Sequence, residues 1–147
     1  MAQSPLTPRL LDAKRAKNLS FAALGDMLDC GEVWIAGLFY GQATATPEQI
    51  EILSKALEIP VEELQSLTVY PVKGSLEQTV PTDPLVYRFY EIIQIYGLPL
   101  KDVIQEKFGD GIMSAIDFSM TVEKESNPAG DRVVLTMNGK FLPYRKW

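Results

Sequence analysis

The feature that most constrains this chain is an apolar helical segment over residues 83–97 (DPLVYRFYEIIQIYG) that carries a pair of charges. Asp83 is a good helix N-cap, Pro84 suits the first helical position, and Gly97 suits the end of a helix. The apolar residues between these limits recur at helical spacing and predict one stripe: Leu85, Phe89, Ile92, Ile93 and Tyr96. The pattern predicts a helix with one buried face.

The two charged residues of this helix, Arg88 and Glu91, stand three positions apart. At about 100° per residue, Arg88 falls between Ile92 and Ile95 around the helix axis, and Glu91 lies just outside them. The pattern places Arg88 on the buried side or at its edge, where a charge is costly unless it is paired. The alternative is an ordinary i,i+3 ion pair on a solvated face, which contributes about 0.2–0.5 kcal/mol. The apolar flanks of Arg88 favour a functional role.

The composition restricts the chemistry that the chain can perform. It has no histidine and one cysteine, Cys30, which we interpret as a small core residue. Ser-His-Asp and Cys-His mechanisms, histidine metal sites, multi-cysteine metal sites and an intrachain disulfide are therefore excluded. We also find no clustered acidic motif for a metal ion. Chemistry must use carboxylates, arginine or lysine, hydroxyls, tyrosine or backbone groups.

Length and charge set further limits. The 147 residues suit one domain, or two small modules that share a core. The net charge of −5 creates no general attraction for nucleic acid or for an anionic membrane. No apolar run approaches the roughly 18 residues of a membrane span, and the N-terminus lacks the apolar core of a signal peptide. We therefore expect a cytoplasmic protein.

The N-terminal part, residues 1–67, is predicted to be helical. Helices are expected to start at Thr7, Ser20 and Thr46, and a short last helix is expected in VEELQSL. The core candidates are Phe21, Leu24, Leu28, Val33, Ile35, Leu38, Ile50, Leu53, Leu57, Ile59 and Leu64.

This part also has the outline of a repressor-like helix-turn-helix domain. Residues 1–67 hold five basic against nine acidic side chains, and the expected recognition helix, residues 30–40, contains Glu32 but no lysine or arginine. Phosphate neutralisation and arginine or lysine contacts to bases supply most DNA affinity. We therefore expect packing and assembly instead of nucleic-acid binding. Three aromatic residues are then core or subunit-interface residues: Trp34, Phe39 and Tyr40.

After a linker over residues 68–82, the C-terminal part, residues 83–147, combines helices and strands. A second helix is expected in LKDVIQEKFG, and the turn Gly109-Asp110-Gly111 stops it and introduces IMSAIDF. From Ile116 the sequence alternates at period two, NPAGD signals a turn, and Asn138-Gly139 signals a hairpin. Two or three strands are predicted. So small a hairpin is marginal alone, so we expect a partner chain to complete it.

Ser114 lies in the segment that follows this glycine-rich turn. Such a serine is usually a cap or turn hydroxyl, and without histidine it cannot be a triad nucleophile. Its remaining functional role is as a donor to an anion, beside backbone N–H groups of the turn. Nearby, Asp110 is interpreted as a turn former and Asp117 as structural.

Taken together, these segments resemble the cyanase (cyanate hydratase, cyanate lyase) family. The resemblance covers the helical N-terminal half, PLVYRFYEIIQIYG, GDGIMSAIDF and the closing GKFLPYR, which is essentially the whole chain. It implies an α+β fold in which the C-terminal helices and strands form an intertwined dimer, and five dimers form a decamer.

The resemblance also implies an activity, the bicarbonate-dependent decomposition of cyanate to carbamate and then to ammonia and carbon dioxide. Arg88, Glu91 and Ser114 would be the catalytic residues. Arg88 and Ser114 would bind the anions, and Glu91 would either orient Arg88 or handle a proton. Bicarbonate would be a co-substrate, with no metal and no organic cofactor. One arginine per chain is little positive charge for two anions, which favours a site shared between subunits. The competing interpretations are an acidic DNA-binding regulator and an assembly protein without chemistry.

Overall fold

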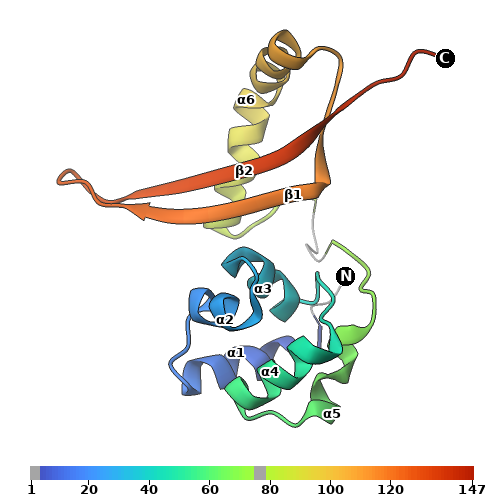
Figure 1. Cartoon of the computed structure of the whole chain (residues 1–147). Helices are drawn as coiled ribbons and strands as arrows, with labels where there is room; N and C mark the ends of the chain where they lie inside the picture. The colour runs from blue at the N-terminus through green and yellow to red at the C-terminus, as the bar shows by residue number, and fades with distance from the viewer. Residues whose placement is uncertain (1–3, 75–78) are drawn as a thin grey trace. The chain divides into compact units, whose positions relative to one another are not determined.

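The computed structural model describes residues 4–74 and 79–147, and the chain divides into two compact units, Met1–Ser75 and Leu76–Trp147 (Figure 1). The described residues form six α-helices, a short 3-10 helix and a two-stranded antiparallel sheet, which confirms the predicted α+β class. The predicted linker, residues 68–82, includes residues 75–78, which lie outside the described residues.

The first unit is helical throughout. Its elements are α1 (Thr7–Ala16), α2 (Phe21–Leu28), α3 (Glu32–Phe39), α4 (Pro47–Leu57), α5 (Val61–Leu64) and the 3-10 helix η1 (Gln65–Thr68). The predicted helix-turn-helix outline corresponds to α2 and α3, which are joined by residues 29–31. No helix in the part of the chain that the structure describes has both the length and the apolar character needed to span a membrane.

Local capping explains where two of these helices begin. Ser20 Oγ accepts a hydrogen bond from the Ala23 amide at 3.0 Å, in front of α2. In front of α4, Thr46 and Gln49 form a reciprocal capping box, and Pro47 occupies the first helical position. The predicted starts at Ser20 and Thr46 are therefore confirmed.

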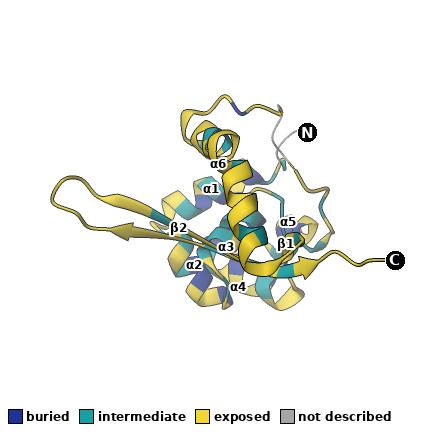
Figure 2. Cartoon of the chain, turned by 90° about the horizontal axis from the view of Figure 1, so that it is seen from above, coloured by how far each residue is buried: buried dark blue, intermediate teal, exposed yellow. Residues whose placement is uncertain are grey.

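The core of the first unit contains most of the residues that the sequence predicts. Figure 2 shows buried residues on its helices, and nine of the eleven core candidates are among them: Leu24, Leu28, Ile35, Leu38, Ile50, Leu53, Leu57, Ile59 and Leu64. Phe21 and Val33 are only partly buried, so their assignment to the core was too strong. Phe39 is fully buried, and its ring meets that of Phe21 edge to face at 5.3 Å. Trp34 and Tyr40 remain 37% exposed.

The second unit contains one helix, α6 (Pro84–Phe108), where the sequence predicts two. Asp83 caps it as predicted, since its carboxylate accepts from the amides of Leu85 and Val86 at 2.8 and 2.9 Å. Gly97, predicted as the helix end, and Pro99 both lie inside α6. Glycine and proline cost a helix about 1 and 3 kcal/mol, but they do not forbid it when the helical pattern resumes behind them.

The strands of the second unit are β1 (Gly111–Glu125) and β2 (Arg132–Pro143), which form one antiparallel hairpin. The predicted turn at NPAGD is confirmed, because the Gly130 amide donates to the Asn127 carbonyl at 2.9 Å and Gly130 has a φ of 123°. The predicted hairpin turn at Asn138-Gly139 is wrong, since both residues lie inside β2 opposite Ser119 and Phe118.

The second unit has almost no core of its own. Not one residue of α6 is buried, and the unit's only buried residues among those described are Pro81 and Ser114. Leu85 and Ile93, two residues of the predicted apolar stripe, are 69% and 54% exposed. The stripe exists, but the second unit offers no surface that buries it, and α6 is largely exposed (Figure 2).

The first unit gives a direct test of its packing. Leu53→Ala removes a fully buried side chain from α4 and is expected to lower the free energy of unfolding by about 2–5 kcal/mol. Ile52→Ala is the matched control, because its side chain is 37% exposed and is expected to cost about 1 kcal/mol or less. Urea unfolding followed by far-UV circular dichroism measures both. Equal losses would contradict the core described here.

Candidate active site

Arg88 and Glu91 form an ion pair on α6. An Arg88 Nη1 N–H donates to Glu91 Oε2 across one turn of the helix. The two side chains are 66% and 37% exposed. Arg88, predicted on the buried side of the helix or at its edge, is exposed in this structure, because no other element of the second unit covers α6 there. Its guanidinium stays open to solvent on an apolar helix.

Ser114 lies in β1 at a break in the register of the hairpin. Met113 pairs with Phe141, whereas Phe118 pairs with Gly139, so residues 114–117 face Lys140 alone. Ser114, in the segment that follows the Gly109-Asp110-Gly111 turn, thus lies in a β-bulge inside a strand. Bulges bend the strand and re-aim a side chain, and they recur beside active sites.

The Ser114 hydroxyl holds this bulge together. Its Oγ accepts hydrogen bonds from the amides of Ile116 at 3.0 Å and Asp117 at 2.9 Å, and Ser114 is only 6% exposed. A hydroxyl has two acceptor lone pairs and one proton. Both lone pairs are therefore engaged, and the O–H proton is free to be donated. The Ile116 and Asp117 amides thereby hold the Ser114 side chain in place.

The acidic residues near the bulge have structural positions. The Asp110 carbonyl accepts from the Tyr144 amide at 3.1 Å, and its carboxylate accepts from Gln105 Nε2 at 3.3 Å. Asp110 thereby links the end of α6 to the segment after β2. Asp117 contributes its amide to Ser114 and keeps an exposed side chain.

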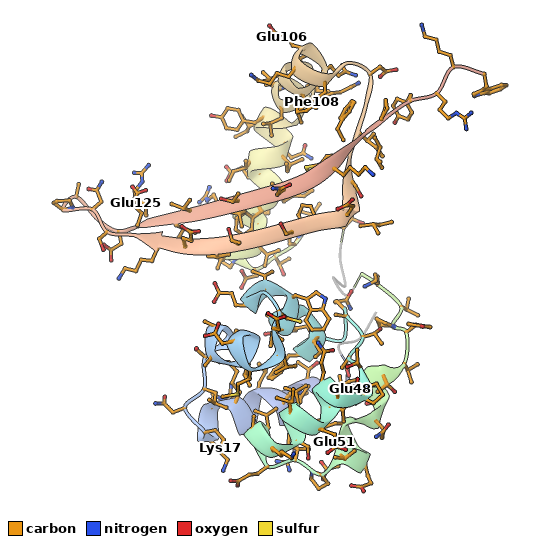
Figure 3. The ribbon with its side chains drawn as sticks, in the orientation of Figure 1. Lys17, Glu48, Glu51, Glu106, Phe108 and Glu125 are labelled. Atoms are coloured by element: carbon orange, nitrogen blue, oxygen red, sulfur yellow. The ribbon has the colours of Figure 1, made fainter. Side chains whose placement is uncertain are left out.

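The polar contacts of the single chain do not unite the three predicted site residues. Among the described residues, no hydrogen bond or ion pair joins Ser114 to Arg88 or Glu91. Phe108, at the C-terminal end of α6 (Figure 3), stacks on Phe141 of β2 with ring centroids 5.1 Å apart and so joins α6 to the hairpin. Arg88 and Glu91 lie near the opposite end of α6.

The sequence interpretation did not identify Gly139 as part of the site region. Gly139 pairs with Phe118 at the edge of the bulge, and the sequence predicts a turn at the Asn-Gly pair that contains it. No local pattern distinguishes a glycine that makes a turn from one that makes room for another strand. As to metals, the described residues contain no group of three or more histidine, cysteine, aspartate or glutamate side chains placed to hold an ion.

Comparison with known proteins shows which family this chain resembles. Residues 78–146 match the family described as "Cyanate lyase C-terminal domain". The cyanate hydratase of Prochlorococcus marinus subsp. pastoris is 59% identical over 147 residues, which is 100% of both chains. This chain belongs to the cyanate hydratase (cyanate lyase) family.

Other relatives agree with this assignment. The cyanate hydratase of Synechococcus sp. strain CC9311 is 62% identical over 144 residues, covering 98% of this chain and 96% of that protein. The crystal structure of cyanase from T. urticae matches with a TM-score of 0.82 at 36% identity, over 95% of this chain and 97% of that one. The resemblance to the cyanase family, and with it the expectation of an enzyme of the lyase class, is confirmed.

The bulge predicts a measurable effect of the serine in this cyanate hydratase family member. Ser114→Ala removes the acceptor of the Ile116 and Asp117 amides, so hydrogen–deuterium exchange over residues 114–118 is expected to accelerate. Ser119→Ala is the matched control, since Ser119 is exposed in the regular part of the same strand. Mass spectrometry of peptides from this region measures the rates. Unchanged exchange in Ser114→Ala would contradict the two hydrogen bonds.

Proposed function

We propose that this chain is a cyanate hydratase that decomposes cyanate with bicarbonate as co-substrate. The observation that carries the proposal is the end-to-end identity of 59% with a protein of that name. In the proposed reaction, a bicarbonate oxygen attacks the cyanate carbon. The dicarbonate-like adduct then loses carbon dioxide to leave carbamate, which breaks down to ammonia and a second carbon dioxide. One cyanate, one bicarbonate and two protons thus become one ammonia and two carbon dioxide molecules, and the proposed reaction involves no metal or organic cofactor.

The physical demand of this reaction is the close approach of two small anions. At a separation of about 4 Å, two unit charges repel by about 1 kcal/mol in water and by more in a pocket of low dielectric constant. Arg88 supplies a permanent positive charge with several fixed N–H donors. Its guanidinium is available, because two thirds of the side chain is exposed in the single chain.

Ser114 is proposed to donate its hydroxyl proton to an oxygen of the bound anion or adduct. The hydrogen bonds from the Ile116 and Asp117 amides support this direction of donation, because they occupy the lone pairs of Oγ. A donor that is fixed before the ligand arrives needs no reorganisation as negative charge moves to the adduct. Holding both reactants side by side supplies a further part of the rate gain.

Glu91 has two candidate roles, to orient Arg88 or to handle the bicarbonate proton. The ion pair with Arg88 favours the first role. The variant Glu91→Gln separates the roles. If Glu91 only orients Arg88, activity falls at every pH by the same factor. If it handles a proton, the limb of the pH–rate profile that belongs to Glu91 disappears.

We also propose that the site is shared between chains of an intertwined dimer, in an assembly of five dimers. Two observations support a shared site. The apolar residues of α6 and the hairpin are not buried within the second unit, and a two-stranded hairpin is marginal by itself. Moreover, Ser114 makes no polar contact with Arg88 or Glu91 of its own chain among the described residues. A second chain would cover α6 and bring the missing group.

The proposed activity and the role of Arg88 can be tested together. Ammonia release from cyanate is expected to require bicarbonate and to fall at least about 100-fold in Arg88→Ala, the size of effect seen when one stabilising donor is removed. Arg88→Lys keeps the charge but loses the planar fork of donors, so it is expected to recover only part of the rate. Light scattering confirms that the oligomer persists. Absence of cyanate turnover by the wild type would contradict the proposal.

The shared site is tested by mixing inactive subunits. Arg88→Ala and Ser114→Ala chains are unfolded together and refolded as a mixture, and each is also refolded alone as the control. If one pocket takes Arg88 and Ser114 from different chains, mixed oligomers contain some intact pockets, and activity rises above both controls. Pockets built from one chain would leave the mixture as inactive as its parts.

A further inference from the structure

The bulge around Ser114 depends on the strand that faces it. Residues 114–117 leave the regular ladder and face only Lys140, with Met113–Phe141 and Phe118–Gly139 as the flanking pairs. An irregular segment of this length has no ladder of its own to fix it. Its position is set by the two hydrogen bonds to Ser114 Oγ and by the contact of the bulge with β2.

Gly139 is the residue on which the bulge rests. A Cβ built at position 139 would stand 2.5 Å from Met113 Cγ, 3.1 Å from Met113 Sδ, and closer still to the carbonyl oxygen of Ser114. The methionine side chain is flexible and could move aside. The Ser114 carbonyl belongs to the backbone, so it can move only if the bulge moves with it.

Backbone conformation does not explain the glycine. The described glycines with a positive φ are Gly41, Gly74, Gly109 and Gly130, and Gly139 is not among them. Alanine would be allowed at position 139 by its dihedral angles and is excluded only by the space that the Ser114 carbonyl occupies. The glycine therefore serves the close approach of two backbones.

We propose that Gly139 is a positioning residue for Ser114: the missing side chain lets the bulge close against β2 and so fixes the Ser114 hydroxyl as a preorganised donor. A side chain at this position pushes the Ser114 backbone away from β2. The hydroxyl then leaves the place where an anion meets it, although Gly139 itself touches no ligand. The proposal rests on the proposed role of Ser114 in anion binding.

The decisive variant is Gly139→Ala. We expect kcat with cyanate and bicarbonate to fall about 100-fold or more, as for the loss of a fixed donor, and to the level of Ser114→Ala. Because Gly139 acts through Ser114, the double variant Ser114→Ala/Gly139→Ala is expected to be no worse than Ser114→Ala alone. Asn138→Ala, an exposed neighbour on the same strand, is the control and is expected to keep wild-type turnover. Wild-type turnover in Gly139→Ala, or a further loss in the double variant, would overturn the proposal.

Hydrogen–deuterium exchange separates a local shift from a general loss of structure and does not depend on activity. Gly139→Ala is expected to accelerate exchange over residues 114–118 and to leave the regular pairs Met120–Met137, Thr121–Thr136 and Val122–Leu135 protected. Loss of protection along the whole hairpin would mean a merely structural role and would overturn the inference. If the wild type fails to turn over cyanate, the proposed function fails, whereas this measurement still decides whether Gly139 positions Ser114.

Discussion

Along α6, apolar side chains are exposed because the second unit has no other element that covers them, and this constraint governs the whole second unit. The first unit satisfies its apolar residues internally, with side chains such as Leu24, Ile35 and Leu53 fully buried. The second unit buries none of the residues of its long helix. Burial of apolar area is the main favourable term in folding, so a stable second unit requires another surface. In the proposed dimer, a second copy of the same chain would meet that need with a matching apolar face, and stability would then depend on protein concentration.

The exposure of α6 also determines how much the Arg88–Glu91 ion pair contributes to stability. In a single chain the pair is exposed, and an exposed i,i+3 pair contributes well under about 1 kcal/mol. Once a partner covers the apolar neighbours, the two charges lose part of their hydration, and each becomes costly without the other. In the proposed shared site, the pair would let Arg88 remain beside an apolar interface while its other N–H donors stay available to an anion. In the proposed function, the Arg88 guanidinium both pairs with Glu91 beside the subunit interface and binds the anion.

The sequence predicted what local rules determine and missed what another strand or chain determines. Ser20, Thr46 and Asp83 cap helices because a short polar side chain reaches the free amides of the next turn. Gly97 and Asn138-Gly139 failed as end and turn signals because tertiary structure overrides weak local preferences. Ser114 was found by its place in a family motif, whereas its position in a bulge depends on the register of β1 against β2. Arg88 was expected on a buried face, and that face needs a second chain.

A bulge is a suitable support for a donor in a chain without histidine. Because no imidazole is available to pick up and return protons, stabilisation of an anionic adduct must come from fixed charges and fixed N–H or O–H donors. A serine at the tip of a free loop would lose a rotamer and two soft backbone dihedrals when it met a ligand. Ser114 has already lost that freedom, since its Oγ accepts from two amides of its own bulge and its carbonyl lies against Gly139. In the proposed function, folding of the hairpin bears the entropy cost before the ligand arrives, so the hydrogen bond from Ser114 to the anion would retain more of its strength.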